Sequence, residues 1–304
     1  MKNSKIIQIL SLLIILLSLW FIGDKFWVHH NWIISSAFNF ELITIIVICS
    51  IVYGLSEFLL SFAWRNLLIL CGHKNISVNL CHKIYGKSQI AKYIPGNVFH
   101  VLGRHVLANQ AGINHIVLAG AAIYEILGLL STSILISFSG MAIFGLKNIY
   151  FSFHQIIISL TVTIIISVLI SFSAPYFMKL KGITLPYKRK WDYVLNISKI
   201  YFFYFLFFLI AGLLLVFIVK IFIEINFFIS AKIIVIFSIA WLAGFIIPGA
   251  PGGIGVREVV IIFFISPIVG EAQSTVVAIV LRFITLLGDL WFLIISNSRI
   301  KLRK

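Results

Sequence analysis

Charged residues are scarce in this 304-residue sequence, where they make up 11% of the chain. Hydrophobic residues make up 61%, and the mean hydropathy is +1.12. Because soluble domains carry about 25% charged residues, this composition excludes a soluble protein. Several windows exceed the roughly 18 apolar residues that mark a transmembrane helix, and transmembrane strands would show short alternating segments instead. The sequence therefore predicts an all-α, polytopic helical membrane protein.

Cysteine is also rare, with three residues in the chain, too few and too irregularly spaced for a disulfide framework. Cys71, His73, Cys81 and His82 could supply two thiolates and two imidazoles to zinc, but their spacing matches no familiar zinc-finger pattern. We interpret them as ordinary interfacial residues. The sequence predicts no metal site and no cofactor.

Motifs for nucleotide binding and for catalysis are missing as well. "GAPGGIG" (249–255) lacks the Gly-Lys-Ser/Thr ending of a P-loop, and "GGIGVRE" (252–258) is not the dinucleotide fingerprint. No Asp-x-Asp motif or acidic cluster is present, so no enzyme is expected. The 24 basic residues outnumber 9 acidic ones, but they flank apolar segments. Attraction to anionic lipids explains them better than nucleic-acid binding does.

The N-terminal segment 1–23 superficially imitates a signal peptide, since basic residues precede an apolar run. Its apolar part is long for a signal peptide and no small-x-small cleavage site follows, so we expect a retained first helix. The longest polar stretch, about 20 residues between Lys179 and Lys199, is far shorter than the ~50 residues of a domain. We expect a single transmembrane domain over 1–304, without an appended soluble catalytic domain.

Hydropathy predicts six full spans and two interrupted apolar segments. The spans are expected at about 6–22, 42–63, 116–144, 154–177, 200–223 and 274–297. Segments 78–112 and 233–265 each contain a Pro-Gly interruption, and proline removes a backbone donor and disfavours helix in the residue before it. We expect both to form re-entrant hairpins. The residues expected at the breaks are Pro95, Gly96, Pro248, Gly249 and Pro251.

The distribution of Lys and Arg tests this layout, because cytoplasmic loops are enriched in them. If the N-terminus is cytoplasmic, eighteen of the 24 basic residues, Lys92 and Arg104 among them, fall on the cytoplasmic side. The C-terminus is then also cytoplasmic, and the hairpins enter from opposite faces. Pseudo-halves 1–150 and 151–304 become inverted repeats, an arrangement found in many secondary transporters.

A short internal match supports this duplication. "IPGNVFHVLGRHV" (94–106) and "IPGAPGGIGVREV" (247–259) align without gaps and share Ile-Pro-Gly, an arginine nine residues after the proline, and a valine two residues later. The two arginines are Arg104 and Arg257. Chance recurrence of Ile-Pro-Gly in an Ile-rich chain is the alternative explanation.

These segments carry a family resemblance. "KYIPGNVFHVLGR" (92–104), the Trp-Arg of "SFAWRNLLILCG" (61–72), "YEILGLL" (124–130), "PGAPGGIGVRE" (248–258) and "LRFITLLGDLW" (281–291) resemble the lysylphosphatidylglycerol synthase transmembrane region, also called the flippase-like domain family. The resemblance covers nearly the whole chain. Its Pro-Gly-Gly-x-Gly-x-x-Glu element is the most specific part. One departure is Ile126, which follows Glu125 where the family more usually has Glu-Arg.

The resemblance implies a domain that handles amphiphilic lipids in the plasma membrane of a prokaryote. In multidomain relatives this domain moves aminoacylated phosphatidylglycerol between leaflets, while a separate soluble domain transfers the aminoacyl group. Without that domain, lysyl transfer is not expected here. Stand-alone relatives are often encoded with glycolipid, polysaccharide or isoprenoid pathways, so enzymes of envelope biosynthesis are candidate partners.

The break in the second interrupted segment, 233–265, suggests where a lipid headgroup binds. Its glycines permit positive φ and close backbone approach, and irregular backbone at membrane depth is tolerated only where protein buries it or water lines it. A half-helix starting near Val256 would direct its N–H groups and positive dipole end towards a cavity that suits phosphate. The candidate headgroup-binding residues are Arg104, Arg257, Arg282, Gly252, Gly253, Gly255 and Asn97.

Ionisable residues inside spans are usually functional or paired. We expect Glu125, Glu258 and Asp289 to balance the arginines and to exchange protons, with structural ion pairs as the alternative. Arg282 and Asp289, seven residues apart, line up on one helical face without touching. Glu57 is expected near the membrane interface, and so are the histidines, including His100 and His105.

The sequence thus predicts a flippase-like protein whose central cavity accepts the headgroup of an anionic phospholipid, glycolipid or polyprenyl-phosphate-linked lipid. Alternating exposure of the cavity would move that lipid between leaflets. One alternative is an integral-membrane subunit or glycosyltransferase-type accessory of lipid-linked saccharide synthesis. A small-solute transporter is another.

Overall fold

The chain is described by a computed structural model over residues 40–73, 75–93, 99–144, 190–247 and 251–298, with single positions between 20 and 28 and between 154 and 165. The expected spans 6–22 and 154–177 lie outside the continuous ranges. Within those ranges all regular structure is helical, in eight α-helices and two short 3-10 helices. The all-α prediction is confirmed.

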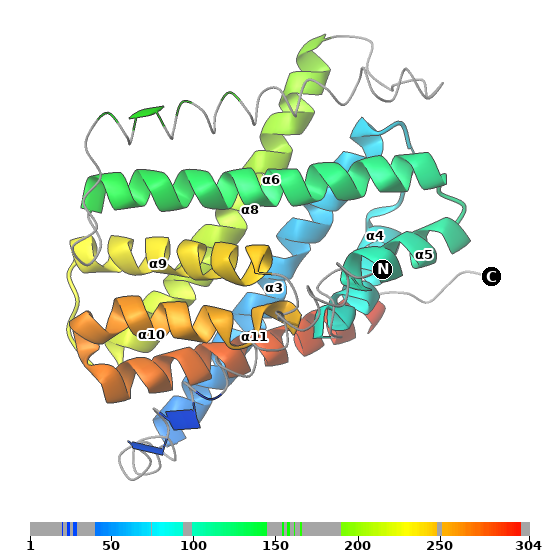
Figure 1. The fold of residues 1–304 in the computed structure, drawn as a ribbon. Helices are drawn as coiled ribbons and strands as arrows, with labels where there is room; N and C mark the ends of the chain where they lie inside the picture. The colour runs from blue at the N-terminus through cyan, green and yellow to red at the C-terminus, as the bar shows by residue number, and fades with distance from the viewer. Residues whose placement is uncertain are drawn as a thin grey trace, which may run out of the picture.

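Four long helices form the frame of the molecule (Figure 1): α3 (Phe40–Leu70), α6 (His115–Phe144), α8 (Lys190–Lys220) and α11 (Glu271–Ser298). Together with α9 (Phe227–Ile246), they are the five helices of the described chain that are long and apolar enough to span a membrane. A helix of 30 residues is about 45 Å long and exceeds the roughly 30 Å of hydrocarbon core. Each long helix can therefore cross the membrane at a tilt.

Two of these helices are longer than the hydropathy pattern predicts. α8 begins at Lys190, ten residues before the expected start at 200, and α3 ends at Leu70 instead of residue 63. The last turns of α3 stay helical because Trp64, Leu67 and Leu68 are buried in the core. The start of α8 contacts the same region, because Asn196 Nδ2 donates a hydrogen bond to the carbonyl oxygen of Asn66 at 2.9 Å.

Both interrupted segments form helical pairs, as predicted. The first contains α4 (Val78–Gln89), the 3-10 helix η1 (Ile90–Tyr93) and α5 (Phe99–Gln110). The second contains α9, the 3-10 helix η2 (Pro251–Gly253) and α10 (Val256–Val269). They differ in one respect: α9 is 20 residues long and starts before the expected 233, because the Asn226 side chain caps it at the Ile229 N–H. Of the four α-helices in the two hairpins, only α9 is long and apolar enough to span a membrane.

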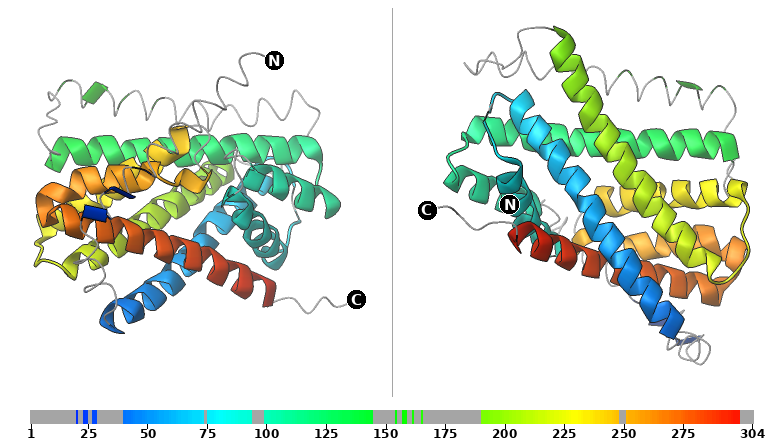
Figure 2. Two further views of the ribbon diagram at one scale, coloured as in Figure 1. Left: turned by 60° about the horizontal axis from the view of Figure 1, so that its bottom comes forward. Right: turned by 180° about the vertical axis from the view of Figure 1, so that it is seen from behind.

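The same order of elements occurs twice and in opposite directions. A long helix, an interrupted hairpin and a second long helix make up α3 to α6, and again α8 to α11. The colour gradient of Figure 1 shows α3 and α8 running in opposite directions, and α6 and α11 likewise. Seen from behind in Figure 2, α3 and α8 cross the other long helices as one layer, and the two pack against each other. The 3-10 helices η1 and η2 also contact each other, so the two breaks meet inside the molecule.

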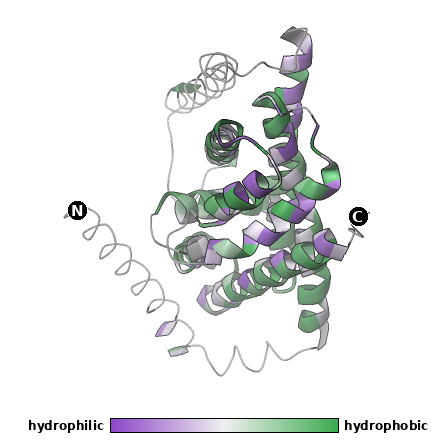
Figure 3. Cartoon of the chain, turned by 90° about the vertical axis from the view of Figure 1, so that its right-hand side faces the viewer, coloured by the Kyte–Doolittle hydropathy of each residue, from purple (hydrophilic) through white to green (hydrophobic). Residues whose placement is uncertain are grey.

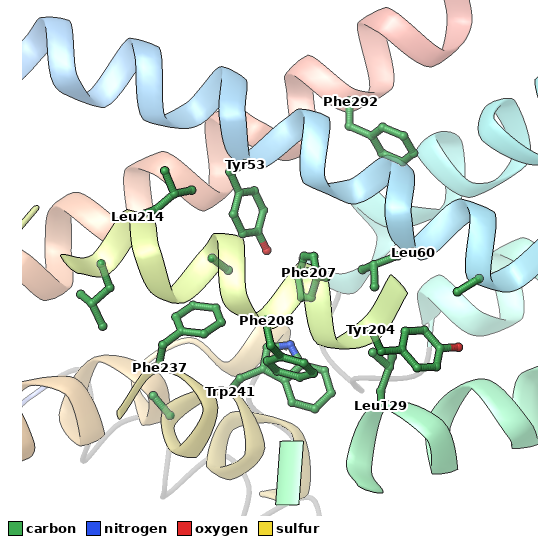
Figure 4. Packing of buried hydrophobic residues seen from close by; sticks show 14 of the residues in the cluster. Tyr53, Leu60, Leu129, Tyr204, Phe207, Phe208, Leu214, Phe237, Trp241 and Phe292 are labelled. Atoms are coloured by element: carbon green, nitrogen blue, oxygen red, sulfur yellow. The ribbon is translucent and has the colours of Figure 1, made fainter. Parts of the chain in front are cut away.

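Aromatic side chains fill the space between α3, α8 and α9 (Figure 4). Phe207 and Phe208 of α8 are almost completely buried, and the rings of Phe208 and Trp241 meet edge to face with centroids 5.1 Å apart. Tyr53 of α3 meets Phe207 in the same way at 6.0 Å. Such pairs stabilise packing by about 0.5–1.5 kcal/mol beyond the burial of their area.

Glycines allow α3 and α11 to cross with their backbones in contact. A Cβ built on Gly54 would lie 2.6 Å from the carbonyl oxygen of Gly288, and one on Gly288 would lie 2.6 Å from Cδ1 of Tyr53. Real side chains do not approach so closely, so both positions require glycine. The crossing places Glu57 of α3 and Asp289 of α11 in one polar cluster, since each follows its glycine closely.

Most residues of the long helices are hydrophobic, whereas hydrophilic residues are more frequent on α4 and α5 (Figure 3). Exposed apolar side chains on α8 include Phe202, Phe205 and Phe217. Exposed side chains of this kind suit contact with lipid. Four polar residues of the first hairpin are buried inside the protein: His82, Ser88, Gln89 and Arg104.

Candidate functional site

A cavity lies beside the contact between the two hairpin breaks and is lined by residues of both. Its aromatic wall includes Tyr53, Phe207, Trp241 and Phe245, and Gly252 of η2 adds backbone. Its charged lining and much of its polar lining come from six residues on six elements: Glu57, Gln89, Lys92, His100, Glu125 and Arg257. The cavity is therefore amphipathic, with apolar and ionic surfaces facing the same space.

Both carboxylate oxygens of Asp289 accept hydrogen bonds. It is fully buried, and the Lys92 ammonium donates to its Oδ1 at 2.7 Å. The Tyr93 hydroxyl donates to its Oδ2. Both donors belong to η1, so this cluster attaches the first hairpin break to α11. Asp289 thus balances Lys92, and not one of the three arginines as the sequence predicted.

Arg104 is held by an ion pair, a hydrogen bond to a serine and a contact with an aromatic ring. Its Nη1 lies 2.5 Å from both carboxylate oxygens of Glu125, and its Nε donates to Ser88 Oγ at 3.3 Å. The guanidinium also lies 3.5 Å from the centroid of the Tyr85 ring, whose hydroxyl donates to Glu125 at 2.8 Å. Arg104 and Glu125 are both buried. The ion pair exists although Ile126 replaces the arginine that is more usual in the resembling family.

Arg282 connects the second hairpin break to α11. Its Nη1 donates to the carbonyl oxygen of Gly252 at 3.2 Å, and its Nε lies 3.6 Å from Glu258 Oε1. The other oxygen of Glu258 accepts the backbone N–H of Gly255 at 2.7 Å. A carboxylate of the chain itself therefore occupies the start of α10, where the sequence suggested amides open to phosphate. The positive end of that helix stabilises Glu258.

The glycines of this break adopt the conformation that the sequence predicts. Gly252, Gly253 and Gly255 have φ of +57°, +75° and +85°, which only glycine adopts without strain. A Cβ on Gly252 would lie 3.2 Å from the Tyr93 ring, so this glycine marks the contact between the two breaks. Five further residues assigned to the breaks or to the site lie outside the described residues: Pro95, Gly96, Asn97, Pro248 and Gly249.

Arg257 differs from the other cations of the cluster. Its side chain is partly buried and lines the cavity, but within the described residues no carboxylate lies within 4.0 Å of it. Its Nε is buried without a hydrogen-bond acceptor. Two glycines make room for the side chain, because a Cβ on Gly244 or on Gly253 would lie 2.6 Å or 2.5 Å from its atoms. The guanidinium also lies over the Trp241 ring, 5.8 Å from its centroid.

Sequence reasoning missed several residues of this site. Glu57, expected near the interface, is 0% exposed and lies on the cavity wall, where Gln89 Nε2 donates to its Oε1 at 3.1 Å. Lys92, assigned to the cytoplasmic side, is 15% exposed and points inward. His100 also lines the cavity instead of the interface, whereas His105 is partly exposed and lies beside the exposed His115, with ring nitrogens 2.9 Å apart. One sequence feature could have identified Lys92 and Tyr93 as site residues: they stand immediately before the Ile-Pro-Gly break.

The alternative of a zinc site receives no support from the described residues, where no three His, Cys, Asp or Glu side chains gather around one point. Cys71 and Cys81 are both buried. Burial raises the pKa of the Cys71 thiol to about 12. The His82 Nδ1 is engaged by Ser61 Oγ at 2.8 Å.

Comparison with known proteins gave no relative: no model of a known protein family matches the chain, and no curated protein matches it. The resemblance to the lysylphosphatidylglycerol synthase transmembrane region therefore rests on the motifs quoted above.

Proposed function

We propose that this protein is a flippase-like membrane protein that binds the anionic headgroup of a lipid in its central cavity and transfers it between leaflets. The observation that carries the proposal is Arg257. A cation held inside a membrane protein without a countercharge is costly, and a bound phosphate would supply the missing charge and hydrogen-bond acceptors.

The form of the cavity supports a lipid as the ligand. Charged and aromatic side chains face the same space, which suits an amphipathic ligand such as a lipid headgroup with the start of its acyl chains. The surrounding long helices expose apolar side chains outward, so acyl chains can remain in the bilayer. Tyr53, Phe207 and Trp241 provide an apolar wall for the part of the lipid next to its phosphate.

The inverted halves support a transport cycle. The cavity lies where two oppositely directed hairpins meet, and the ion pairs Lys92–Asp289 and Arg282–Glu258 connect each break to α11. Rocking of one half against the other would open the cavity to one leaflet at a time. We place the protein in the plasma membrane of a prokaryote with both termini cytoplasmic, in accordance with the distribution of Lys and Arg.

Native mass spectrometry of copurified lipids tests the binding step. We expect phosphate-containing lipids on the wild-type protein, their loss in Arg257→Gln, and their retention in Lys220→Gln, a matched change at an exposed lysine. A second arm adds inorganic phosphate to the wild-type protein. If phosphate displaces the lipid and is bound equally well, the ligand is a free anion and the lipid assignment is wrong.

Transfer between leaflets is tested in proteoliposomes that contain a fluorescent phosphatidylglycerol, by the fraction of probe accessible to an external quencher. We expect faster equilibration with the wild-type protein than with Arg257→Gln, and no difference between wild type and Lys220→Gln. Equal rates for the wild type and Arg257→Gln would contradict the proposed site.

A further inference from the structure

Glu57 is the least satisfied acid of the buried cluster. Asp289, Glu125 and Glu258 each accept short hydrogen bonds, from Lys92 at 2.7 Å, from Arg104 at 2.5 Å and from the Gly255 amide at 2.7 Å. Glu57 accepts one bond, from the neutral Gln89 amide at 3.1 Å. Its Oε2 is buried and has no hydrogen-bond partner.

The nearest cation to Glu57 is already engaged. Lys92 Nζ lies 3.8 Å from Glu57 Oε1 but 2.7 Å from Asp289 Oδ1. One lysine therefore lies between two buried carboxyl groups and bonds to only one of them. An ionised Glu57 would leave an anionic oxygen buried without a donor, which is unfavourable. A proton on Glu57 removes that charge.

The charge of the cluster depends on this proton. In the described chain, four cations and four carboxyl groups form the cluster: Lys92, Arg104, Arg257 and Arg282, with Glu57, Glu125, Glu258 and Asp289. With all eight ionised, the cluster is neutral and offers no net attraction to an anion. With Glu57 protonated, one positive charge is unmatched, and Arg257 is the cation without a carboxylate beside it.

We infer that Glu57 is a proton-carrying residue, and that the cavity takes up a singly charged lipid phosphodiester together with one proton. This inference rests on the proposed function, because it assumes that Arg257 holds the headgroup. The proton moves from bulk water to the Glu57 carboxylate, and the anion then finds one unmatched cation. A diphosphate-linked lipid carries more negative charge than this cation neutralises, so the charge balance favours a phosphodiester.

Other titratable groups face Glu57 and have to be distinguished from it. Lys92 of η1, His100 of α5, Glu125 of α6 and Arg257 of α10 line the same cavity, and so do Tyr53 of α3 and Tyr85 of α4. Asp289 of α11 shares Lys92. Glu125 and Asp289 are held by direct ion pairs, which leaves His100 as the competing proton site, since its Nδ1 is buried without a partner.

The test is titration calorimetry of the purified protein, in an uncharged detergent, with a short-chain phosphatidylglycerol as the probe. Titrations at about pH 6 and about pH 8, in buffers of different ionisation enthalpy, give the affinity and the number of protons taken up per lipid. At about pH 8, where free Glu57 is ionised, we expect the wild type to take up a proton on binding, and its affinity should fall by up to about tenfold per pH unit; at about pH 6, where Glu57 already carries its proton, uptake should be small. In Glu57→Gln, proton uptake and the fall in affinity should both disappear, whereas both should persist in His100→Gln.

The outcomes separate the two proposals. Proton-free binding by the wild type at about pH 8, or an unchanged pH dependence in Glu57→Gln, overturns the proton-carrying role and leaves the lipid site intact. Loss of the pH dependence in His100→Gln instead assigns the proton to His100. Equal binding by wild type and Arg257→Gln contradicts the proposed function itself. The proton count is measured on the wild type, so the test does not depend on how well the Glu57 variant folds.

Discussion

Arg104 and Arg257 occupy equivalent positions in the two halves, nine residues after the proline of each Ile-Pro-Gly break, but their surroundings are opposite. Arg104 is bonded to Glu125 and Ser88 and stacked on Tyr85. Arg257 has a tryptophan ring and two glycines around it, and a cavity in front of it. The same residue, in the same place of a repeated unit, is paired within the protein in one half and faces a cavity in the other, where we propose that it binds a ligand.

The two arginines differ because the neighbouring long helix supplies a carboxylate to only one of them. In the first half, α6 presents Glu125 to the arginine of its hairpin. In the second half, the acid at hand is Glu258, which follows Arg257 directly, and it is engaged by the Gly255 amide and Arg282. The two copies of a duplicated site can thus differ in role. Arg104 holds its hairpin against α6, whereas Arg257 has no carboxylate partner among the described residues.

The largest effect is expected from Arg104→Gln. This change leaves Glu125 buried and unpaired, and breaking a buried pair on one side costs about 3–5 kcal/mol. Thermal unfolding in detergent should show a marked loss of stability. The double variant Arg104→Gln/Glu125→Gln should recover part of it, because no uncompensated charge remains. Arg257→Gln serves as the comparison and should unfold close to the wild type. If Arg257→Gln is equally destabilised, Arg257 is a structural residue too.

A smaller and more selective effect is expected from Gly244→Ala. The added Cβ would lie 2.6 Å from Cγ of Arg257, so the arginine side chain has to move away from Gly244. Overpacking of this kind costs about 1–3 kcal/mol. We also expect short-chain phosphatidylglycerol to bind about tenfold more weakly, which corresponds to about 1.4 kcal/mol. The measurement is titration calorimetry together with thermal unfolding.

The matched control is Gly103→Ala, beside the other arginine. There the nearest atom to an added Cβ is Ser88 Cβ at 4.0 Å, an ordinary contact, so stability and binding should both stay near wild-type values. Weaker binding in both glycine variants would show that any change near either arginine disturbs the cavity, and the distinction between the two halves would fail.

The sequence was sufficient to predict the helical class, the two interrupted hairpins and the inverted halves, because long apolar runs and Pro-Gly breaks are local signals. It was not sufficient for the ion pairs. Lys92 and Asp289 are 197 residues apart, and a rule that assigns basic residues near span ends to the cytoplasm cannot show that a hairpin turns one of them inward. Only the close approach of η1 and α11 determines that pair.

Glu57 illustrates how an error in a helix boundary becomes an error in function. With the span expected to end at residue 63, Glu57 was placed near the interface. Because α3 continues to Leu70, Glu57 lies thirteen residues before its end, in the middle of the crossing with α11. The helix continues because Trp64, Leu67 and Leu68 are buried by other parts of the chain, which is tertiary information.

The smallest effect on stability is expected from Glu57→Gln, and it should be compared with Glu125→Gln. Glu125→Gln leaves Arg104 without its countercharge and should cost about 3–5 kcal/mol. Glu57→Gln replaces a carboxyl group by a neutral group of the same shape, so a Glu57 that is protonated in the folded protein should tolerate it with a change below about 1 kcal/mol. Thermal unfolding at about pH 7 measures both. Equal destabilisation of the two variants would mean that Glu57 is ionised and holds Lys92 as firmly as Glu125 holds Arg104, and both halves would then be fixed by ion pairs alone.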